Sequence, residues 1–574
     1  QGVIDMRYLA LATDYDGTLA SNDQVAEQTV HALERLKISG RRVILVTGRR
    51  LDDLLSVCSC PQLFDSVVAE NGAIIYNPRS RKATRLANPP SKLLIQGLRA
   101  RGVEPLEIGE VLVATDAAHR ATVQDVIWDL GLEAQVIGNR GAVMVLPAGV
   151  NKATGLDHAL RELGLSRHEV VGIGDAENDH SFLERCECAV AVANAAPAIK
   201  QIADFTTAGK NGNGVVELID ELISYDLDRL QGALARNQIL LGKRSDGTEV
   251  HLGPYGHNVL VAGPSGCGKS TLTAGIVERL IAKGYQVCIV DPEGDYGTLR
   301  DVVTLGNQWR APSVQESLSL LEDPNINLSI NLLGISLQDR PAFFAQLAPN
   351  IQAMRARTGR PHWIVLDEAH HMVPDTWGHA ATVLPLKLRE TILVTVHPGH
   401  VAAAILASID VVVAIGHSPE QTIESFAKAT GRPIAWPVDL GWQADRVIVW
   451  RDADGQPLFP MYAEPGRVER IRHRRKYAEG DLRWHSFYFR GQDGQHNLKA
   501  QNLLVFCQLA QGIDEESWLF HLRRGDYSRW FRGAIKDEYL ANETERIEGR
   551  YDLSPLQTRQ MIQELVAARY TLPD

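Results

Sequence analysis

Two loops that can handle phosphate lie on this chain, and each directly follows an apolar, strand-like run. The first loop, residues 14–18, follows residues 8–12, and the second, residues 263–271, follows residues 258–262. In α/β folds, ligands bind outside the carboxyl ends of the strands, where such loops lie. The first loop carries a carboxylate pair suited to forming an aspartyl-phosphate. The second can hold a nucleoside triphosphate with its backbone N–H groups. We therefore expect two α/β domains with different chemistries.

Length and composition indicate a soluble protein of several domains. A chain of 574 residues is too long for one core, and its 45% apolar and 22% charged residues are ordinary for globular proteins. We find no apolar run of the ~18–20 residues that a membrane helix needs. We also find no basic-then-apolar leader, so a cytoplasmic protein without a membrane partner is expected. The net charge of −11 gives no overall attraction to nucleic acid.

Three polar clusters in the N-terminal part follow strand-like runs, and helical stretches alternate with these runs. This alternation predicts a parallel sheet, so the clusters should meet at one edge of it. The clusters are Asp14 with Asp16, Thr47-Gly48-Arg49 and Gly174-Asp175, after residues 8–12, 43–46 and 170–173.

Phosphoryl transfer through a carboxylate needs a nucleophile, an acid/base, donors for the phosphoryl oxygens and a magnesium ion. The motifs D-x-D-G-T, T-G-R, a lone Lys and G-D-x-x-N-D occur in this order, at residues 14–18, 47–49, 152 and 174–179. This set resembles the Cof-type branch of the haloacid dehalogenase superfamily. The resemblance implies a Mg²⁺-dependent phosphatase with a Rossmann-like core and an inserted α+β cap.

The resemblance also implies a role for each motif residue. Asp14 would be the nucleophile and Asp16 the general acid/base, while Thr47 and Lys152 would bind the phosphoryl group. The implied magnesium site consists of Asp14, the Asp16 backbone carbonyl, Asp175 and Asp179. Domain boundaries follow from the motif positions: the core takes residues 6–76 and 148–222, the cap 77–147 and a linker 223–237. So small a cap favours a small phosphorylated substrate, such as a sugar phosphate or phosphoglycolate, by analogy of fold.

The second loop has the pattern of a phosphate-binding loop between a strand and a helix. Lys269 is expected to neutralise the β- and γ-phosphates, and the Ser270 hydroxyl to bind Mg²⁺. A later apolar run ends in Asp367 and Glu368, which are expected to hold Mg²⁺ and to polarise the attacking water. ATP and Mg²⁺ are thus the predicted cofactors. The residues of the loop are Gly263, Pro264, Ser265, Gly266, Cys267, Gly268, Lys269, Ser270 and Thr271.

Together with residues 291–296, 367–371 and 392–398, this loop resembles the HerA/FtsK branch of RecA-like P-loop ATPases. The resemblance covers residues 238–468 and implies a homo-oligomer, with a hexamer favoured, and DNA as a candidate partner. Val396 departs from the branch, which usually places a Gln there to sense the γ-phosphate, and His397 is one candidate substitute. An arginine acting in the neighbouring subunit's site is also expected, with four candidates: Arg355, Arg357, Arg360 and Arg389.

Residues 469–574 are rich in aromatic and charged side chains and predict a small, mainly helical domain. Its aromatic residues, Trp484 and Phe487 to Phe489 among them, favour core packing over base stacking. The basic run at residues 472–476 is interpreted as a solvated surface.

The leading hypothesis is a bifunctional hydrolase, a phosphatase fused to a HerA-like ATPase. Three alternatives stay open. They are a kinase/phosphatase of nucleic-acid ends, an ATP-gated phosphatase without motor activity, and an effector of a nucleic-acid-sensing assembly.

Overall fold

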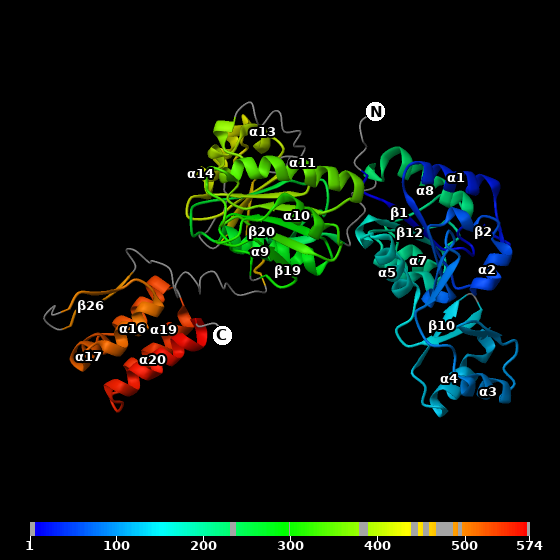
Figure 1. Ribbon diagram of the computed structural model, residues 1–574, viewed down its shortest axis with the longest axis horizontal. Coiled ribbons are helices and arrows are strands. Elements are labelled where there is room, and N and C mark those ends of the chain that lie inside the picture. The colour runs from blue at the N-terminus through cyan, green and yellow to red at the C-terminus, as the bar shows by residue number, and fades with distance from the viewer. Residues whose placement is uncertain are drawn as a thin grey trace. The chain divides into compact units, whose positions relative to one another are not determined.

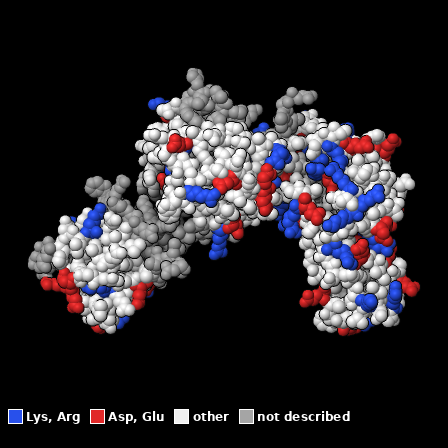
Figure 2. Space-filling model, viewed as in Figure 1, with Lys and Arg blue, Asp and Glu red and all other residues white. Residues whose placement is uncertain are grey.

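The computed structural model divides into two compact units, residues 1–465 and 466–574 (Figure 1). It describes residues 6–139, 141–229, 237–297, 299–377, 388–437, 446–451, 458–466, 486–491, 496–535 and 537–570. The basic run at 472–476, Trp484 and residues 230–236 of the predicted linker lie outside this set. Within it, no helix combines the length and the apolar character needed to cross a membrane. On the face drawn in Figure 2, basic and acidic side chains of the first unit are interspersed.

The first sheet has eight strands in the order β14-β13-β12-β1-β4-β5-β6-β7. Strands β14 to β5 run parallel, and their continuous apolar runs reflect burial on both faces. Its strands are β1 (Ala10–Thr13), β4 (Arg42–Val46), β5 (Ser66–Ala69), β6 (Ile74–Asn77), β7 (Lys82–Arg85), β12 (Val170–Gly174), β13 (Cys188–Ala191) and β14 (Phe205–Thr206). The same domain contains a hairpin of β2 (Ala20–Ser21) and β3 (Gln24–Val25), and helices α1 (Glu27–Ile38), α2 (Leu51–Val57), α5 (Lys152–Leu163), α6 (His180–Arg185), α7 (Pro197–Ile202) and α8 (Gly212–Tyr225).

A small α+β domain is inserted between β7 and α5, with its own antiparallel sheet in the order β10-β11-β9-β8. Apolar side chains of its two helices and its sheet form a separate core. Its elements are α3 (Lys92–Ala100), β8 (Glu107–Ile108), β9 (Val113–Asp116), α4 (Arg120–Asp129), β10 (Ala134–Asn139) and β11 (Ala142–Pro147). The hairpin β6–β7 belongs to the core sheet, because β6 pairs with β5 as well as with β7. The predicted cap start at residue 77 therefore lies inside this hairpin.

The second large sheet has eleven strands in the order β16-β15-β25-β24-β23-β17-β22-β21-β18-β20-β19. Strands β23 to β19 run parallel, while β24, β25, β15 and β16 are antiparallel. The antiparallel pair β15–β16 forms a hairpin around Ser245-Asp246-Gly247. The strands are β15 (Ile239–Lys243), β16 (Glu249–Leu252), β17 (Val259–Ala262), β18 (Val287–Asp291), β19 (Val302–Leu305), β20 (Asn327–Asn331), β21 (Trp363–Leu366), β22 (Thr391–Thr395), β23 (Val411–Ala414), β24 (Val447–Arg451) and β25 (Phe459–Ala463).

Apolar clusters cover both faces of this second sheet, as a mainly parallel sheet requires. The helices of this domain are α9 (Lys269–Ala282), α10 (Val314–Leu321), α11 (Arg340–Thr358), α13 (Ala403–Leu406) and α14 (Pro419–Thr430).

The second unit is mainly helical within its described residues. Phe487, Phe489, Phe506, Trp518 and Tyr527 are buried in its core, so these aromatic side chains pack inside rather than offer a stacking surface. Its elements are β26 (Phe487–Phe489), β27 (Leu498–Ala500), α16 (Leu503–Gly512), α17 (Glu515–Arg523), α18 (Asp526–Trp530), α19 (Glu538–Glu548) and α20 (Pro555–Tyr570).

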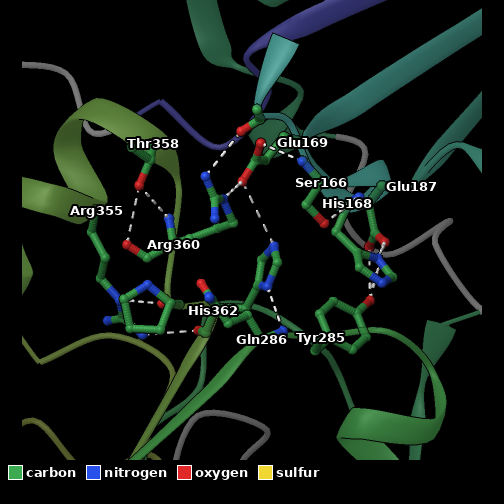
Figure 3. A network of polar contacts seen from close by, with 12 residues as sticks. Ser166, His168, Glu169, Glu187, Tyr285, Gln286, Arg355, Thr358, Arg360 and His362 are labelled. Carbon is green, nitrogen blue, oxygen red and sulfur yellow. Dashed lines mark hydrogen bonds and ion pairs between the residues drawn. The ribbon is translucent and has the colours of Figure 1, made fainter. Parts of the chain in front are cut away.

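A buried polar junction joins the two α/β domains of the first unit (Figure 3). Glu169 Oε1 forms an ion pair with Arg360 Nε at 2.9 Å, and the Glu169 and Arg360 side chains are 1% and 2% exposed. Beside them, His168 stacks on Tyr285 with ring centroids 3.8 Å apart and lies 2.6 Å from Glu187. These residues stand at or just before the starts of their strands, β12 and β13 in one sheet and β18 and β21 in the other. The junction therefore lies at the opposite strand ends from the predicted sites.

Candidate active sites

The strand ends of the first sheet bring three predicted residues together. Asp14, Thr47 and Asp175 directly follow β1, β4 and β12, which are parallel neighbours in register. All three side chains are nearly or completely buried. Thr18, from the first motif, donates a hydrogen bond to Asp175 Oδ1 at 3.1 Å. Neighbouring parallel strands thus place the motif residues in one pocket.

Lys152 is the centre of this pocket. Its Nζ donates to Asp14 Oδ1 and to Asp179 Oδ1, both at 2.6 Å, and its side chain is 0% exposed. It is the first residue of α5, whose N-cap is Asn151. Gly72 fixes this helix start, because at its φ of 105° a Cβ atom would lie 1.9 Å from the Asn151 carbonyl oxygen. The lone lysine predicted from its place in the motif order does lie among the motif carboxylates.

Three carboxylates in this pocket can share a cation. Asp14, Asp175 and Asp179 each place one oxygen within 4.8 Å of the others, and they are the one such group within the described ranges. Lys152 pairs with two of them, Asp14 and Asp179. Burial and the neighbouring Asp179 raise the pKa of Asp14 to about 7, although Lys152 opposes the shift. Three converging carboxylate oxygens fit a divalent cation such as Mg²⁺.

The Asp16 side chain lies apart from this group and is held by Arg49. Arg49 binds both carboxylate oxygens of Asp16, at 2.8 and 2.7 Å, and also pairs with Asp23 and with Asp53. Any contribution of Asp16 to a metal site would thus come from its backbone, as the resemblance implies. Arg49 was seen in the T-G-R motif but given no role. Its contacts to Asp16 and Asp23, which are distant in sequence, could not be read from the motif.

A cleft of about 290 Å³ separates the core carboxylates from the inserted domain. Asp14, Asp16 and Arg49 line it from the core, and Thr115 and Met144 line it from the cap. Glu70 ties the two parts together: its buried carboxylate accepts hydrogen bonds from the backbone N–H groups of residues 110–112 at 2.8–2.9 Å. Sequence reasoning missed Glu70, because a single acid outside the four motifs gives no local signal.

The second site lies at the end of β17, where the loop of residues 263–268 leads into α9. Gly263 is required here, because a Cβ atom would lie 1.9 Å from the Ile415 carbonyl oxygen. Gly266 and Gly268 also adopt positive φ, at 79° and 102°. Lys269 Nζ donates to the Pro264 carbonyl oxygen at 3.0 Å, so the ammonium lies over the loop. The loop and helix start therefore have the geometry that binds phosphates.

The two predicted acids of this site follow β21, which is separated from β17 by β22 alone. Asp367 and Glu368 are 1% and 9% exposed. Glu368 has φ 43° and ψ 53°, a left-handed conformation that is strained for a residue with a side chain. Strain of this kind persists where the surroundings hold it and is concentrated at functional sites.

The four arginines considered for a role in a neighbouring subunit lie near the junction instead. Arg355 donates to the backbone oxygens of Pro361, Arg389 and His362, at 2.7, 2.6 and 2.8 Å. Arg360 is buried against Glu169, and Arg357 pairs with Glu322. These contacts give three of the four, Arg355, Arg357 and Arg360, partners within the chain.

Comparison with known proteins supports both parts. The family model of haloacid dehalogenase-like hydrolases matches residues 11–105 and 116–219. The model for the central domain of the helicase HerA matches residues 247–358. Phosphoglycolate phosphatase 2 of Saccharolobus solfataricus is 30% identical over 230 residues, which is 38% of this chain and 93% of that protein.

Two further relatives match the same part of the chain. Phosphoglycolate phosphatase of Methanothermobacter thermautotrophicus is 29% identical over 225 residues, 38% of this chain and 99% of that protein. The 5-amino-6-(5-phospho-D-ribitylamino)uracil phosphatase YitU of Bacillus subtilis is 28% identical over 262 residues, 37% of this chain and 97% of that protein.

Proposed function

Because the chain belongs, through its N-terminal part, to the haloacid dehalogenase-like hydrolases, we propose that it hydrolyses phosphomonoesters through an aspartyl-phosphate on Asp14. The observation that carries this proposal is the buried set of Asp14, Asp175 and Asp179 around Lys152. Mg²⁺ bound by the three carboxylates would neutralise the charge of the phosphoryl oxygens. The cleft of about 290 Å³ suits a small phosphorylated substrate.

Each side chain has a distinct part in the proposed reaction. An Asp14 oxygen attacks phosphorus, and the bond to the leaving oxygen breaks as Asp16 donates a proton to it. Asp16 then takes a proton from water, whose oxygen attacks the aspartyl-phosphate and regenerates Asp14. Lys152 and Thr47 hold the phosphoryl oxygens by donating hydrogen bonds. Arg49 keeps the Asp16 carboxylate oriented, since it binds both of its oxygens.

The intermediate itself provides the test. With Asp16→Asn, Asp14 can still attack p-nitrophenyl phosphate, but no base activates water, so phosphate should accumulate on the peptide that contains Asp14. Mass spectrometry after acid quench should find this phosphopeptide in Asp16→Asn and not in Asp14→Asn. Turnover by Asp14→Asn at the wild-type rate would overturn the proposal.

We further propose that the second site hydrolyses ATP. Lys269 would bind the β- and γ-phosphates, Ser270 and Asp367 would hold Mg²⁺, and Glu368 would take a proton from the attacking water. The loop geometry and the match to the HerA central domain support this. The same resemblance supports a homo-oligomer, with a hexamer favoured, and DNA as a partner. ATP turnover that is lost in Lys269→Ala and accelerated by DNA, together with a hexameric mass, would bear this out. A monomer indifferent to DNA would contradict the ring and DNA parts.

The buried junction favours a second candidate, an ATP-gated phosphatase. Glu169 directly precedes β12 and Asp175 directly follows it, while His362 directly precedes β21 and Asp367 directly follows it. Both sites are thus one strand away from the same buried contacts. If ATP binding alters this junction, the rate of p-nitrophenyl phosphate hydrolysis should change as a non-hydrolysable ATP analogue saturates the nucleotide site that contains Lys269. A rate that stays constant through saturation would leave two uncoupled sites.

A further inference from the structure

The carbonyl oxygen at the end of helix α9 is held by two side chains of the N-terminal α/β domain. Helix α9 begins at Lys269, in the phosphate-binding loop, and its C-cap is Lys283. The Lys283 carbonyl oxygen accepts hydrogen bonds from Arg167 Nη2 and, at 2.9 Å, from His168 Nε2. The last carbonyls of a helix lack partners within the helix and carry a partial negative charge, which favours cationic donors. We call Arg167, His168 and the Lys283 carbonyl the α9 clamp.

The α9 clamp is tightly built. Gly284 has φ 88°, and a Cβ atom at this position would lie 3.0 Å from Arg167 Nη2 and 3.2 Å from His168 Nε2. On its other side, the His168 ring stacks on Tyr285, and its Nδ1 lies 2.6 Å from Glu187 Oε2 (Figure 3). Both partners of the ring are acceptors, so these contacts fit a ring with a proton on each nitrogen. The helix that starts at the nucleotide site therefore ends in a close, polar contact with the other domain.

The α9 clamp is one strand away from the metal-binding carboxylates. Arg167 and His168 belong to the 3₁₀ turn Arg167–Glu169, which directly precedes β12. Asp175 directly follows β12, and its backbone N–H donates to Asp179 Oδ2 at 2.9 Å. Because helices and strands are rigid elements, a displacement of α9 would act through the clamp on the strand that leads to Asp175.

The same junction contains a polar contact that is close to becoming a hydrogen bond. His362, directly before β21, accepts a hydrogen bond on Nδ1 from the Gln286 N–H at 2.8 Å. Burial lowers the pKa of His362, so the ring is neutral and its proton is on Nε2. Nε2 lies 4.0 Å from Glu169 Oε1, and neither atom makes a hydrogen bond within the described part of the chain (Figure 3). An approach by roughly 1 Å would form one, so a second, tighter arrangement of the junction is within reach.

We propose that the α9 clamp couples the two sites, so that nucleotide bound at Lys269 strengthens phosphoryl binding at Asp14, and the reverse. The inference rests on both proposed functions and names how one site regulates the other. Nucleotide fixes the start of α9 and the end of β21, while a phosphoryl group with Mg²⁺ fixes the end of β12. Since these three elements meet at the junction, both ligands favour its tighter arrangement. Coupling free energy is reciprocal, so both affinities should rise by the same factor, about fivefold or more.

Two dissociation constants, each measured with and without the other ligand, test this coupling. The ligands are a non-hydrolysable ATP analogue with Mg²⁺, and beryllofluoride, which mimics a phosphoryl group on an aspartate. In the wild type, each Kd should fall about fivefold or more when the other ligand is saturating.

Variants of the α9 clamp should remove the coupling and leave the separate affinities. His168→Phe keeps a ring on Tyr285 but has no N–H, and the methyl group of Gly284→Ala enters the clamp. In both variants neither Kd should depend on the other ligand, while each Kd measured alone stays within about threefold of the wild type. Arg185→Gln is the matched control, because Arg185 pairs with Asp157 inside the N-terminal domain, at 2.6 Å, and should keep the wild-type coupling.

The outcomes separate failure of the coupling from failure of the proposed functions. Independent binding in the wild type, mutual weakening, or coupling that persists in both His168→Phe and Gly284→Ala would overturn the inference and leave the two sites intact. Loss of coupling in Arg185→Gln would also overturn it. By contrast, an analogue that binds Lys269→Ala as tightly as the wild type, or beryllofluoride that binds Asp14→Asn equally well, would refute the site concerned and the inference with it. Circular dichroism of each variant shows whether it is folded, and either clamp variant alone suffices for the test.

Discussion

Removing Arg360 from the junction should destabilise the first unit strongly and in a pH-dependent way. Its guanidinium is 2% exposed and pairs with Glu169, which is 1% exposed, at 2.9 Å. It also donates to the backbone oxygens of Gly164 and Glu322, at 3.0 and 3.3 Å. In Arg360→Met the Glu169 carboxyl would stay buried without its cation. The aliphatic replacement keeps most of the packing, so the change tests the charge.

The magnitude depends on whether Glu169 is ionised. Burial raises the pKa of Glu169 from 4.5 to about 8, although Arg360 and the Ser166 backbone oppose the shift. Since the folded pKa is raised, the protonated group contributes stability below pH 4.5 that is lost as pH rises through 8. At pH 6 the carboxyl is protonated, and Arg360→Met should cost only the lost hydrogen bonds, about 1–2 kcal/mol. At pH 9 the wild-type carboxyl is ionised and paired, and Arg360→Met forces it either to stay charged without a partner or to bind a proton above its pKa, so the cost rises to about 3–5 kcal/mol.

Urea denaturation of matched variants at pH 6 and pH 9 measures this difference. Arg357→Met is the control, because Arg357 stands in the same segment but forms an exposed ion pair with Glu322, worth about 0–1 kcal/mol at either pH. Glu169→Gln combined with Arg360→Met should regain most of the loss at pH 9. If Arg360→Met costs no more than Arg357→Met, or costs the same at both pH values, the buried-charge reasoning is wrong.

Three further predictions concern the phosphatase site. Lys152→Met removes the ammonium that Asp14 and Asp179 share, so it should abolish p-nitrophenyl phosphate hydrolysis and make the melting temperature depend more steeply on the Mg²⁺ concentration. A variant as active as the wild type would contradict this prediction. Arg49→Lys should lower kcat about tenfold with little change in melting temperature, because lysine cannot hold both Asp16 oxygens; an unchanged kcat would show that the clamp is not used. In a thermal shift assay, chelation of the cation with EDTA should lower the melting temperature of the wild type but not that of Asp179→Asn. An equal drop in both proteins would place the cation elsewhere.

Much of the fold and of both sites could be predicted from the sequence, because the signals are local. Asp14, Thr47, Asp175 and Lys269 each stand directly beside a strand or at a helix start, so a run of apolar residues and a motif are enough to place them. The parallel order of the strands then brings them together without further information.

The parts that escaped prediction depend on contacts between distant segments. Arg49 binds Asp16 across 33 positions in the sequence, and Glu70 binds Glu110 of the cap across 40. His370 was visible beside Asp367-Glu368, but its partner Thr395 comes from another strand. The pairing of the β6–β7 hairpin with the core strand β5 likewise joins segments that no local motif connects.

The central claim is that one chain has two separate active sites. The most direct test measures p-nitrophenyl phosphate hydrolysis and ATP hydrolysis, both with Mg²⁺, in wild type, Asp14→Asn and Lys269→Ala. The account predicts that Asp14→Asn loses only the first activity and Lys269→Ala only the second. Loss of both activities in either single variant, or absence of both from the wild type, would contradict two separate sites.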